Sequence, residues 1–254
     1  MAQIAEGSGT DSDAFLDIVR VADSVELKLT ISETVRATTA AALGVDPLDA
    51  QIRQVFFFDT PELALNTAGV IVRARRRQGE AGDTVVKLRP VVPGDISKDL
   101  RRSSGFGVEV DAMPGGFVCS ASMKGTAKNG EIRDVVSGHR AIRKLFSKEQ
   151  RAFYAAHAPE GLELERLSVL GPIPTLKVKV QPEGLGRRLV GELWLYPDGS
   201  QVVELSTKAK PSEAAQVAAE ARAFIVGLGL DLTAEQHTKT KKALEFFSHG
   251  AESP

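Results

Sequence analysis

Residues 70–77 read Val-Ile-Val-Arg-Ala-Arg-Arg-Arg, and apolar and charged residues alternate from Val72 to Arg75. A repeat of two residues is typical of a β-strand, because successive side chains point to opposite faces. We therefore predict a strand with one apolar and one strongly basic face. The same alternation recurs in five further stretches, which are residues 24–28, 85–89, 108–111, 175–179 and 203–208.

The charged faces of these stretches carry both signs. Glu26 precedes Lys28 on one stretch, and Glu204 precedes Lys208 on another. A single strand of this kind is an ordinary half-exposed strand with its charged face in water. Because the pattern recurs along nearly the whole chain, we expect the charged faces to meet around a common space.

The composition is that of a globular protein with local clusters of charge. The chain has 254 residues, of which 43% are hydrophobic and 26% are charged, and its formal net charge is −1. A nearly neutral chain argues against a broad nucleic-acid surface. Cys119 is the single cysteine and excludes an internal disulfide, which agrees with a reducing compartment. We expect a cytoplasmic protein.

Several kinds of motif are missing from the sequence. The first ten residues are polar, unlike a signal peptide, and no run approaches the roughly 18 apolar residues of a membrane span. We therefore expect no membrane partner. The one cysteine and four scattered histidines leave no zinc-binding spacing, and there is no Walker-type glycine loop.

The chain shows no internal repeat and no low-complexity linker, which favours one domain. We expect a flexible lead-in over residues 1–20, a single domain over residues 21–248, and a divergent, partly helical excursion at about 112–160. Within that excursion, apolar residues at helical spacing predict a helix over about 138–157. Further helices are predicted near residues 32–44, 211–227 and 233–248.

The cations of the charged faces are candidates for binding phosphate. Arginine makes forked contacts to phosphate oxygens, and lysine supplies a compact charge. Like charges at this density repel one another unless an anion lies among them. The members of this set are Lys28, Arg73, Arg75, Lys87, Arg89, Lys177, Lys179 and Lys208, with Arg77 on the same face as Arg73 and Arg75.

Five carboxylates lie in predicted strands, opposite the apolar positions: Glu26, Glu109, Asp111, Glu192 and Glu204. Hard divalent cations such as Mg²⁺ prefer carboxylate oxygens and retain bound water. We assign Glu26 and Glu204 to a metal and add Glu192. An ion pair with a nearby lysine or arginine is an equally good interpretation of Glu109 and Glu192.

The order and spacing of several pieces resemble the CYTH superfamily, also called the triphosphate tunnel metalloenzymes. The resemblance covers about residues 24–245 and is poor over 112–160. Its pieces are Val25-Glu26-Leu27-Lys28, Phe57-Phe58-Asp59-Thr60-Pro61, residues 69–77, Thr84-Val85-Val86-Lys87-Leu88 and Val203-Glu204-Leu205.

The resemblance implies an α+β fold in which an antiparallel β-barrel forms a tunnel, charged inside and with helices packed outside. It also implies Mg²⁺ or Mn²⁺ as the cofactor and a small-molecule triphosphate or polyphosphate as the partner. Glu26 and Glu204 would hold the metal. The phosphates would be held by Lys28, Arg73, Arg75, Lys87, Lys177 and Lys179.

Two positions depart from the family pattern. The opening Glu-x-Glu-x-Lys signature has Ser24 at its first position, and the later Glu-x-Glu reads Glu204-Leu205-Ser206. A serine hydroxyl is a neutral and weaker metal ligand than a carboxylate, so metal affinity should fall. Glu109, Asp111 or Glu192 would have to compensate.

The leading hypothesis is metal-dependent hydrolysis of an inorganic or organic triphosphate, with Lys87 stabilising developing charge and Glu109 orienting the attacking water. A second hypothesis is a non-catalytic module that binds triphosphate, polyphosphate or a nucleotide, motivated by Ser24 and Ser206. A third is a class IV-type adenylate cyclase. The least favoured is a nucleic-acid partner bound by the basic stretch 140–151, whose simpler interpretation is a solvated face.

Overall fold

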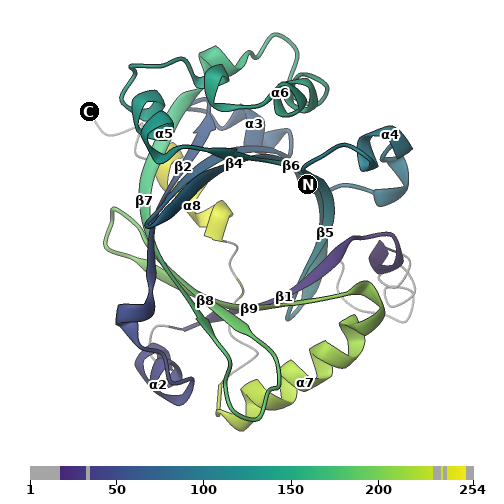
Figure 1. The fold of residues 1–254 in the computed structure, drawn as a ribbon, viewed down its shortest axis with the longest axis vertical. Coiled ribbons are helices and arrows are strands. Elements are labelled where there is room, and N and C mark those ends of the chain that lie inside the picture. The colour runs from purple at the N-terminus through teal and green to yellow at the C-terminus, as the bar shows by residue number, and fades with distance from the viewer. Residues whose placement is uncertain (1–17, 33–34, 231–235, 237–238, 250–254) are drawn as a thin grey trace.

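The strands of this chain close into a barrel in the computed structural model, which describes residues 18–32, 35–230, 236 and 239–249 (Figure 1). Around the barrel the nine strands follow the order β1-β5-β6-β4-β3-β2-β7-β8-β9. Their bounds are β1 Ser24–Ile31, β2 Gln51–Asp59, β3 Val70–Arg77, β4 Glu80–Leu88, β5 Phe106–Met113, β6 Gly116–Ala127, β7 Ser168–Val180, β8 Leu189–Leu195 and β9 Gln201–Ala209.

The barrel confirms the predicted fold class with one difference, since it is mixed and not wholly antiparallel. Strands β1 and β5 run parallel, with Ser24 opposite Glu109 and Glu26 opposite Asp111, and the other neighbours are antiparallel. An odd number of strands cannot alternate in direction all the way around a closed barrel. One parallel pair is therefore a consequence of closure, and it brings two carboxylate-bearing strands together.

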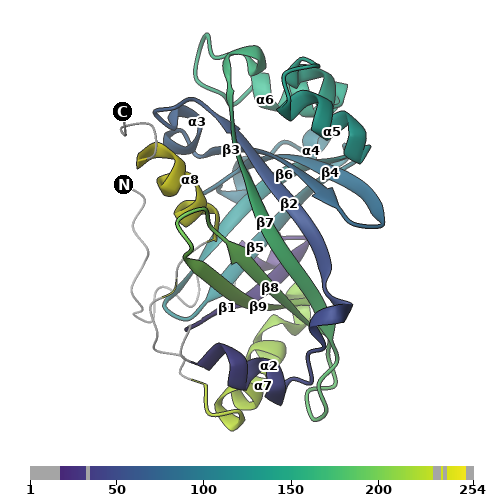
Figure 2. The ribbon, with the colours of Figure 1, turned by 90° about the vertical axis from the view of Figure 1, so that its left-hand side faces the viewer.

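Helices cover the outside of the barrel, where the apolar faces of the strands point (Figures 1 and 2). Ile225 of α7 packs with Leu29 of β1 and Leu205 of β9, and Phe153 of α6 belongs to the large cluster around Val86. The helix bounds are α2 Arg36–Ala42, α3 Ala64–Thr67, α4 Lys98–Arg101, α5 Asn129–Val136, α6 Lys148–Ala155, α7 Ala214–Gly227 and α8 Lys239–His249. No helix in the described ranges is long and apolar enough to span a membrane.

Helix α8 lies at one end of the barrel instead of on its outer wall (Figure 2). Its buried Ala243 and Leu244 pack against Val55, Phe57 and Trp194. The two β2 residues share the face of Arg53, which points inward. The apolar inner rim at this end therefore packs against α8.

The segment between β5 and β7 differs from the sequence prediction. Residues 116–127, which were assigned to the divergent excursion, form the barrel strand β6. The single helix predicted over 138–157 is wrong, because the chain forms a short 3-10 helix at Ile142–Leu145 and then α6. Ser147 caps the start of α6. Its hydroxyl accepts a hydrogen bond from the backbone amide of Gln150, and the side-chain oxygen of Gln150 accepts one from the backbone amide of Ser147.

Candidate functional site

The charged faces predicted from the alternation turn toward the inside of the barrel. On β1, Val25 and Leu29 belong to the apolar clusters outside the barrel, while Glu26 and Lys28 lie on the opposite face. The inner charges form three neighbouring groups of ion pairs. We call them the carboxylate group, the Glu192 group and the arginine row.

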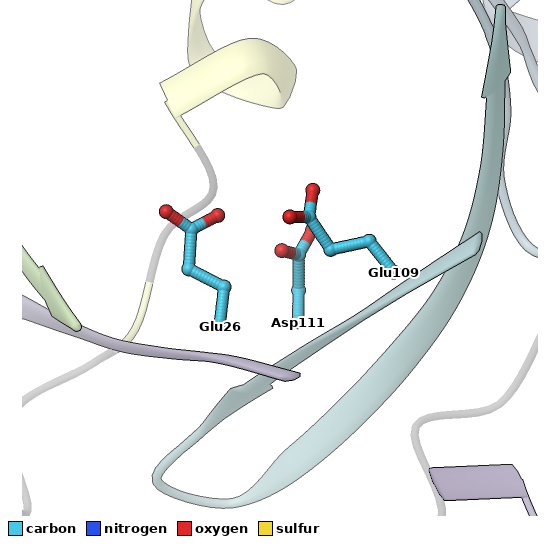
Figure 3. A group of neighbouring side chains, drawn as sticks. All are labelled: Glu26, Glu109 and Asp111. Carbon is cyan, nitrogen blue, oxygen red and sulfur yellow. The ribbon is translucent and has the colours of Figure 1, made fainter. Parts of the chain in front are cut away.

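The carboxylate group consists of Glu26, Glu109 and Asp111, whose nearest oxygen atoms all lie within 4.8 Å of one another (Figure 3). The parallel pairing of β1 and β5 places Glu26 opposite Asp111. Glu109 lies two residues before Asp111, hence on the same face of β5. Among the described residues, no other group of three such side chains meets this spacing.

Three cations surround Asp111, whose side chain is fully buried. Its Oδ1 lies 2.8 Å from Lys28 Nζ, and its Oδ2 lies 3.7 Å from Lys87 Nζ and 3.4 Å from Arg89 Nη2. Burial opposes the ionised form of Asp111, but the three cations outweigh burial and hold its pKa well below the ordinary value. Asp111 is therefore ionised at neutral pH.

The pKa values of the two neighbouring lysines, Lys28 and Lys87, shift in opposite directions. Burial favours the neutral form of Lys28, but the carboxylates of Asp111 and Glu26 outweigh burial and raise its pKa. Lys87 has a lowered pKa, because burial and the nearby charges of Lys28 and Arg89 exceed the effect of Asp111. An anion bound beside Lys87 would oppose this shift and favour the charged form of the lysine.

Side chains from β9 and β1 contact the carboxylate of Glu109. Lys208 Nζ forms an ion pair with its Oε1, and Ser24 Oγ donates a hydrogen bond of 3.3 Å to the same oxygen. Burial opposes ionisation of Glu109, but Lys208 lowers its pKa overall. Ser24, at the position where the family resemblance expects a carboxylate, thus contacts a carboxylate of β5.

The chemistry of the carboxylate group suits a divalent cation. Within the described part of the chain, both oxygens of Asp111 are buried and have ion pairs but no hydrogen bond of good geometry. Such oxygens retain lone pairs for a metal, and the neighbouring carboxylates offer further hard oxygen ligands. The arrangement can therefore bind a metal ion through Glu26, Glu109 and Asp111.

The Glu192 group connects the barrel to α8. Glu192 lies 3.5 Å from Arg53 Nη1 and 3.7 Å from Lys177 Nζ, and it forms an ion pair with Lys239. Lys239 Nζ also lies 2.8 Å from Glu204 Oε1. Burial opposes ionisation of Glu192, but Lys239 and the other nearby cations lower its pKa strongly.

The arginine row comprises Arg73, Arg75 and Arg77 on the inner face of β3. All three lie within 4.0 Å of the carboxylate of Asp83 on β4. Burial, followed by the neighbouring charge of Arg75, lowers the pKa of Arg73 to about 10. Its Nε is buried and has no hydrogen-bond partner in the described ranges. The row therefore keeps unused capacity to donate to an anion.

The structure distributes the predicted site residues among these groups. Lys28, Lys87, Arg89 and Lys208 meet the carboxylate group, whereas Glu192 and Glu204, assigned to the metal, both contact Lys239. Lys179 is exposed and forms no ion pair with any described residue. The roles assigned to these residues remain predictions.

Three inner residues were absent from the predicted set. Arg53 lies two residues before Val55 on the same face of β2. It would have been recognised if the strand had been predicted from residue 51 onward. Asp83 lies on β4, directly opposite Arg75, and the alternating stretch recognised in this strand, residues 85–89, begins two residues after it. Lys239 is one of three lysines in the last helix, and only the docking of α8 distinguishes it from the exposed Lys241.

No protein-family model matches this chain, and no curated protein matches its sequence. Two of the solved structures that match this chain illustrate its fold. One is a candidate adenylate cyclase from Bacillus halodurans, with a TM-score of 0.61 at 13% identity over 86% of this chain and 96% of the other. The second is HpAC1, a candidate adenylyl cyclase from Hippeastrum for which a dominant triphosphatase activity is described. It has a TM-score of 0.62 at 16% identity over 90% of this chain and 97% of the other. This chain thus shares the fold of these two proteins.

Proposed function

We propose that this chain is a metal-dependent triphosphate hydrolase whose substrate binds inside the barrel. The observation that carries the proposal is the close approach of the carboxylate group to Lys28, Lys87 and Arg89 through Asp111. Carboxylates that can hold a metal and cations that can hold phosphate thus face the same interior space. This pairing is what a metal-bound triphosphate requires.

The cations would fix the phosphates. Arg73 and Arg75 offer guanidinium groups on β3, and Lys87 on β4 adds a lysine whose pKa is lowered by burial. A phosphate oxygen at Lys87 would favour the charged form of the lysine. Lys177, whose pKa burial also lowers, and Lys28 would complete the binding surface.

Glu26, Glu109 and Asp111 would hold Mg²⁺ or Mn²⁺. Such an ion neutralises phosphate charge and favours attack by water. In hydrolysis, a bond forms between the water oxygen and the terminal phosphorus while the bridging oxygen–phosphorus bond breaks, releasing orthophosphate and diphosphate from inorganic triphosphate. Glu109 would orient the attacking water, whose proton would pass to solvent, and the cations would stabilise the charge of the leaving diphosphate.

A second candidate function is a non-catalytic module that binds triphosphate, polyphosphate or a nucleotide. It is favoured by the internal pairing of the site, since Glu109 contacts Lys208 while Glu192 and Glu204 contact Lys239. A site whose carboxylates are already neutralised binds metal less readily. Such a module would bind triphosphate without turnover.

The test is phosphate release from inorganic triphosphate, with Mg²⁺ and then Mn²⁺, by the wild-type protein and by Lys87→Ala. We expect release by the wild type and at least about a 100-fold loss in the variant, the scale for removing one group that stabilises transition-state charge. Lys148→Ala, on the exposed surface of α6, is the matched control and should keep full activity.

The outcomes separate the functions. Full activity in Lys87→Ala would contradict the proposed role of the barrel interior. No release, together with a triphosphate-dependent rise in melting temperature, would establish the binding module instead. Formation of cyclic AMP from ATP would identify a cyclase, and neither binding nor turnover would reject all of these functions.

A further inference from the structure

A carboxylate lies among the arginines that would hold phosphate. Asp83 Oδ2 accepts a hydrogen bond of 2.9 Å from Arg75 Nε and lies 2.9 Å from Arg75 Nη2. It also lies 3.6 Å from Arg77 Nε, and Oδ1 lies 4.0 Å from Arg73 Nη2. The carboxylate of Asp83 thus contacts the guanidinium nitrogens that a phosphate would contact in the arginine row.

The contact between Arg75 and Asp83 is built into the sheet. The two residues are direct cross-strand neighbours in the β3–β4 hairpin, where facing side chains are close. Arg75 uses two nitrogens of its fork on one carboxylate oxygen, and the same fork would otherwise hold a phosphate. A phosphate that reaches this row must therefore share the arginine with Asp83 or displace it.

Asp83 lies far from the carboxylate group along the barrel wall. Lys87, which contacts Asp111, lies four residues further along the same face of β4, and this spacing corresponds to about 13 Å along a strand. The negative charge of Asp83 therefore meets the part of a ligand that lies away from Glu26, Glu109 and Asp111.

We propose that Asp83 is a specificity residue that limits how much negative charge the barrel accepts at the arginine row. The inference rests on the proposed binding of triphosphate in the barrel. Two anions held by one arginine fork repel each other, so Asp83 penalises a phosphate at that position. A shorter anion, or a ligand with a neutral or cationic group at that end, avoids the repulsion.

The experiment compares the binding of inorganic triphosphate and of pyrophosphate to the wild type, Asp83→Asn and Glu80→Gln. Isothermal titration is carried out without metal and again with Mg²⁺, and phosphate release is recorded in parallel so that heat from turnover can be subtracted. Asparagine keeps the size of aspartate and can still accept a hydrogen bond from Arg75, but it removes the charge. Glu80→Gln makes the same change of charge at the exposed Glu80, which pairs with Arg77 from the rim of the hairpin.

We expect Asp83→Asn to bind triphosphate about tenfold more tightly than the wild type, with a smaller gain for pyrophosphate, because one close charge repulsion is removed. Glu80→Gln should change either affinity by less than about twofold, as is usual for an exposed pair. If Asp83→Asn fails to fold, Asp83→Ala serves for the same comparison.

The results distinguish the inference from the proposed function. Triphosphate binding by the wild type without a gain in Asp83→Asn would overturn the role of Asp83 and leave the function standing. A gain in Asp83→Asn alone, from a wild type that does not bind, would support the role of Asp83 and reject triphosphate as the native ligand. Absence of binding in both proteins would overturn both proposals.

Discussion

Carboxylates on the neighbouring strand β5 compensate for the missing carboxylate at Ser24. Ser24 stands at the position where the family pattern expects a carboxylate, and its hydroxyl donates to Glu109 on the parallel strand β5. Two residues along each strand, Glu26 faces Asp111. The acidic residues that could bind a metal therefore come from β1 and β5, and not from two positions on β1.

Glu26 is predicted to contribute to the affinity of the carboxylate group for a metal. We expect Glu26→Gln to weaken Mn²⁺ binding by at least about tenfold, because it removes one carboxylate oxygen from the group. The signal of free Mn²⁺ in electron paramagnetic resonance measures this without turnover. Glu131→Gln is the control, since Glu131 lies on α5 and pairs with Arg140. Equal Mn²⁺ affinity in Glu26→Gln and the wild type would reject the assignment.

At the scale of one element, the first residue of α8 brings a cation to the charged interior of the barrel. This residue, Lys239, reaches both Glu192 and Glu204 and lies 5.4 Å from the centre of the Trp194 ring. Burial favours the neutral form of Lys239, but the two carboxylates raise its pKa. Ala243 and Leu244 provide the apolar contacts of the same helix.

We expect Lys239→Met to lower the free energy of unfolding by about 3–5 kcal/mol, the scale for removing one partner of a buried ion pair. Glu204 loses this ion pair, while Glu192 keeps Arg53 and Lys177. Urea unfolding followed by circular dichroism measures this change. Lys241→Met is the matched control on the same helix, because the side chain of Lys241 is mostly exposed. A loss below about 1 kcal/mol in Lys239→Met would show that its ion pairs contribute little.

The helix prediction over residues 138–157 failed for a reason that belongs to this scale. The apolar spacing of that stretch is shared by two short helices, so periodicity alone joined them. The Ser147-x-x-Gln150 capping box was the local signal of a new helix start. Strand β6 escaped notice because two successive inward positions carry the small, uncharged Ser120 and Ser122, so the alternation there lacks the charged residues that marked the other strands.

Buried charged groups inside the barrel make the stability of the whole molecule depend on pH. Asp111 and Glu192 both have strongly lowered pKa values in the folded state, because nearby cations outweigh burial. The folded protein therefore binds fewer protons than the unfolded chain in acid. Their stabilising contribution is present above the ordinary carboxylate pKa of about 4 and is lost as pH falls further.

We expect the free energy of unfolding to fall between pH 6 and pH 3, and the difference between wild type and Asp111→Asn to shrink over the same interval. Urea unfolding at several pH values provides the measurement. Glu163→Gln, at an exposed position, should leave the wild-type profile unchanged. A difference that stays constant between pH 6 and pH 3 would contradict the coupling of Asp111 to its cations.

The sequence alone determined most of the strands and most of their charged faces, because the direction of a side chain from a strand is a local property with a period of two. Val72-Arg73-Ala74-Arg75 and Glu26-Leu27-Lys28 could be assigned in this way. Only the tertiary structure decided which charges meet. Ser24 and Glu109 lie 85 residues apart, and their contact follows from the closure of an odd-stranded barrel. Several cations could equally have paired with Asp111, Asp83 or Glu192, and strand order together with the docking of α8 selected among them.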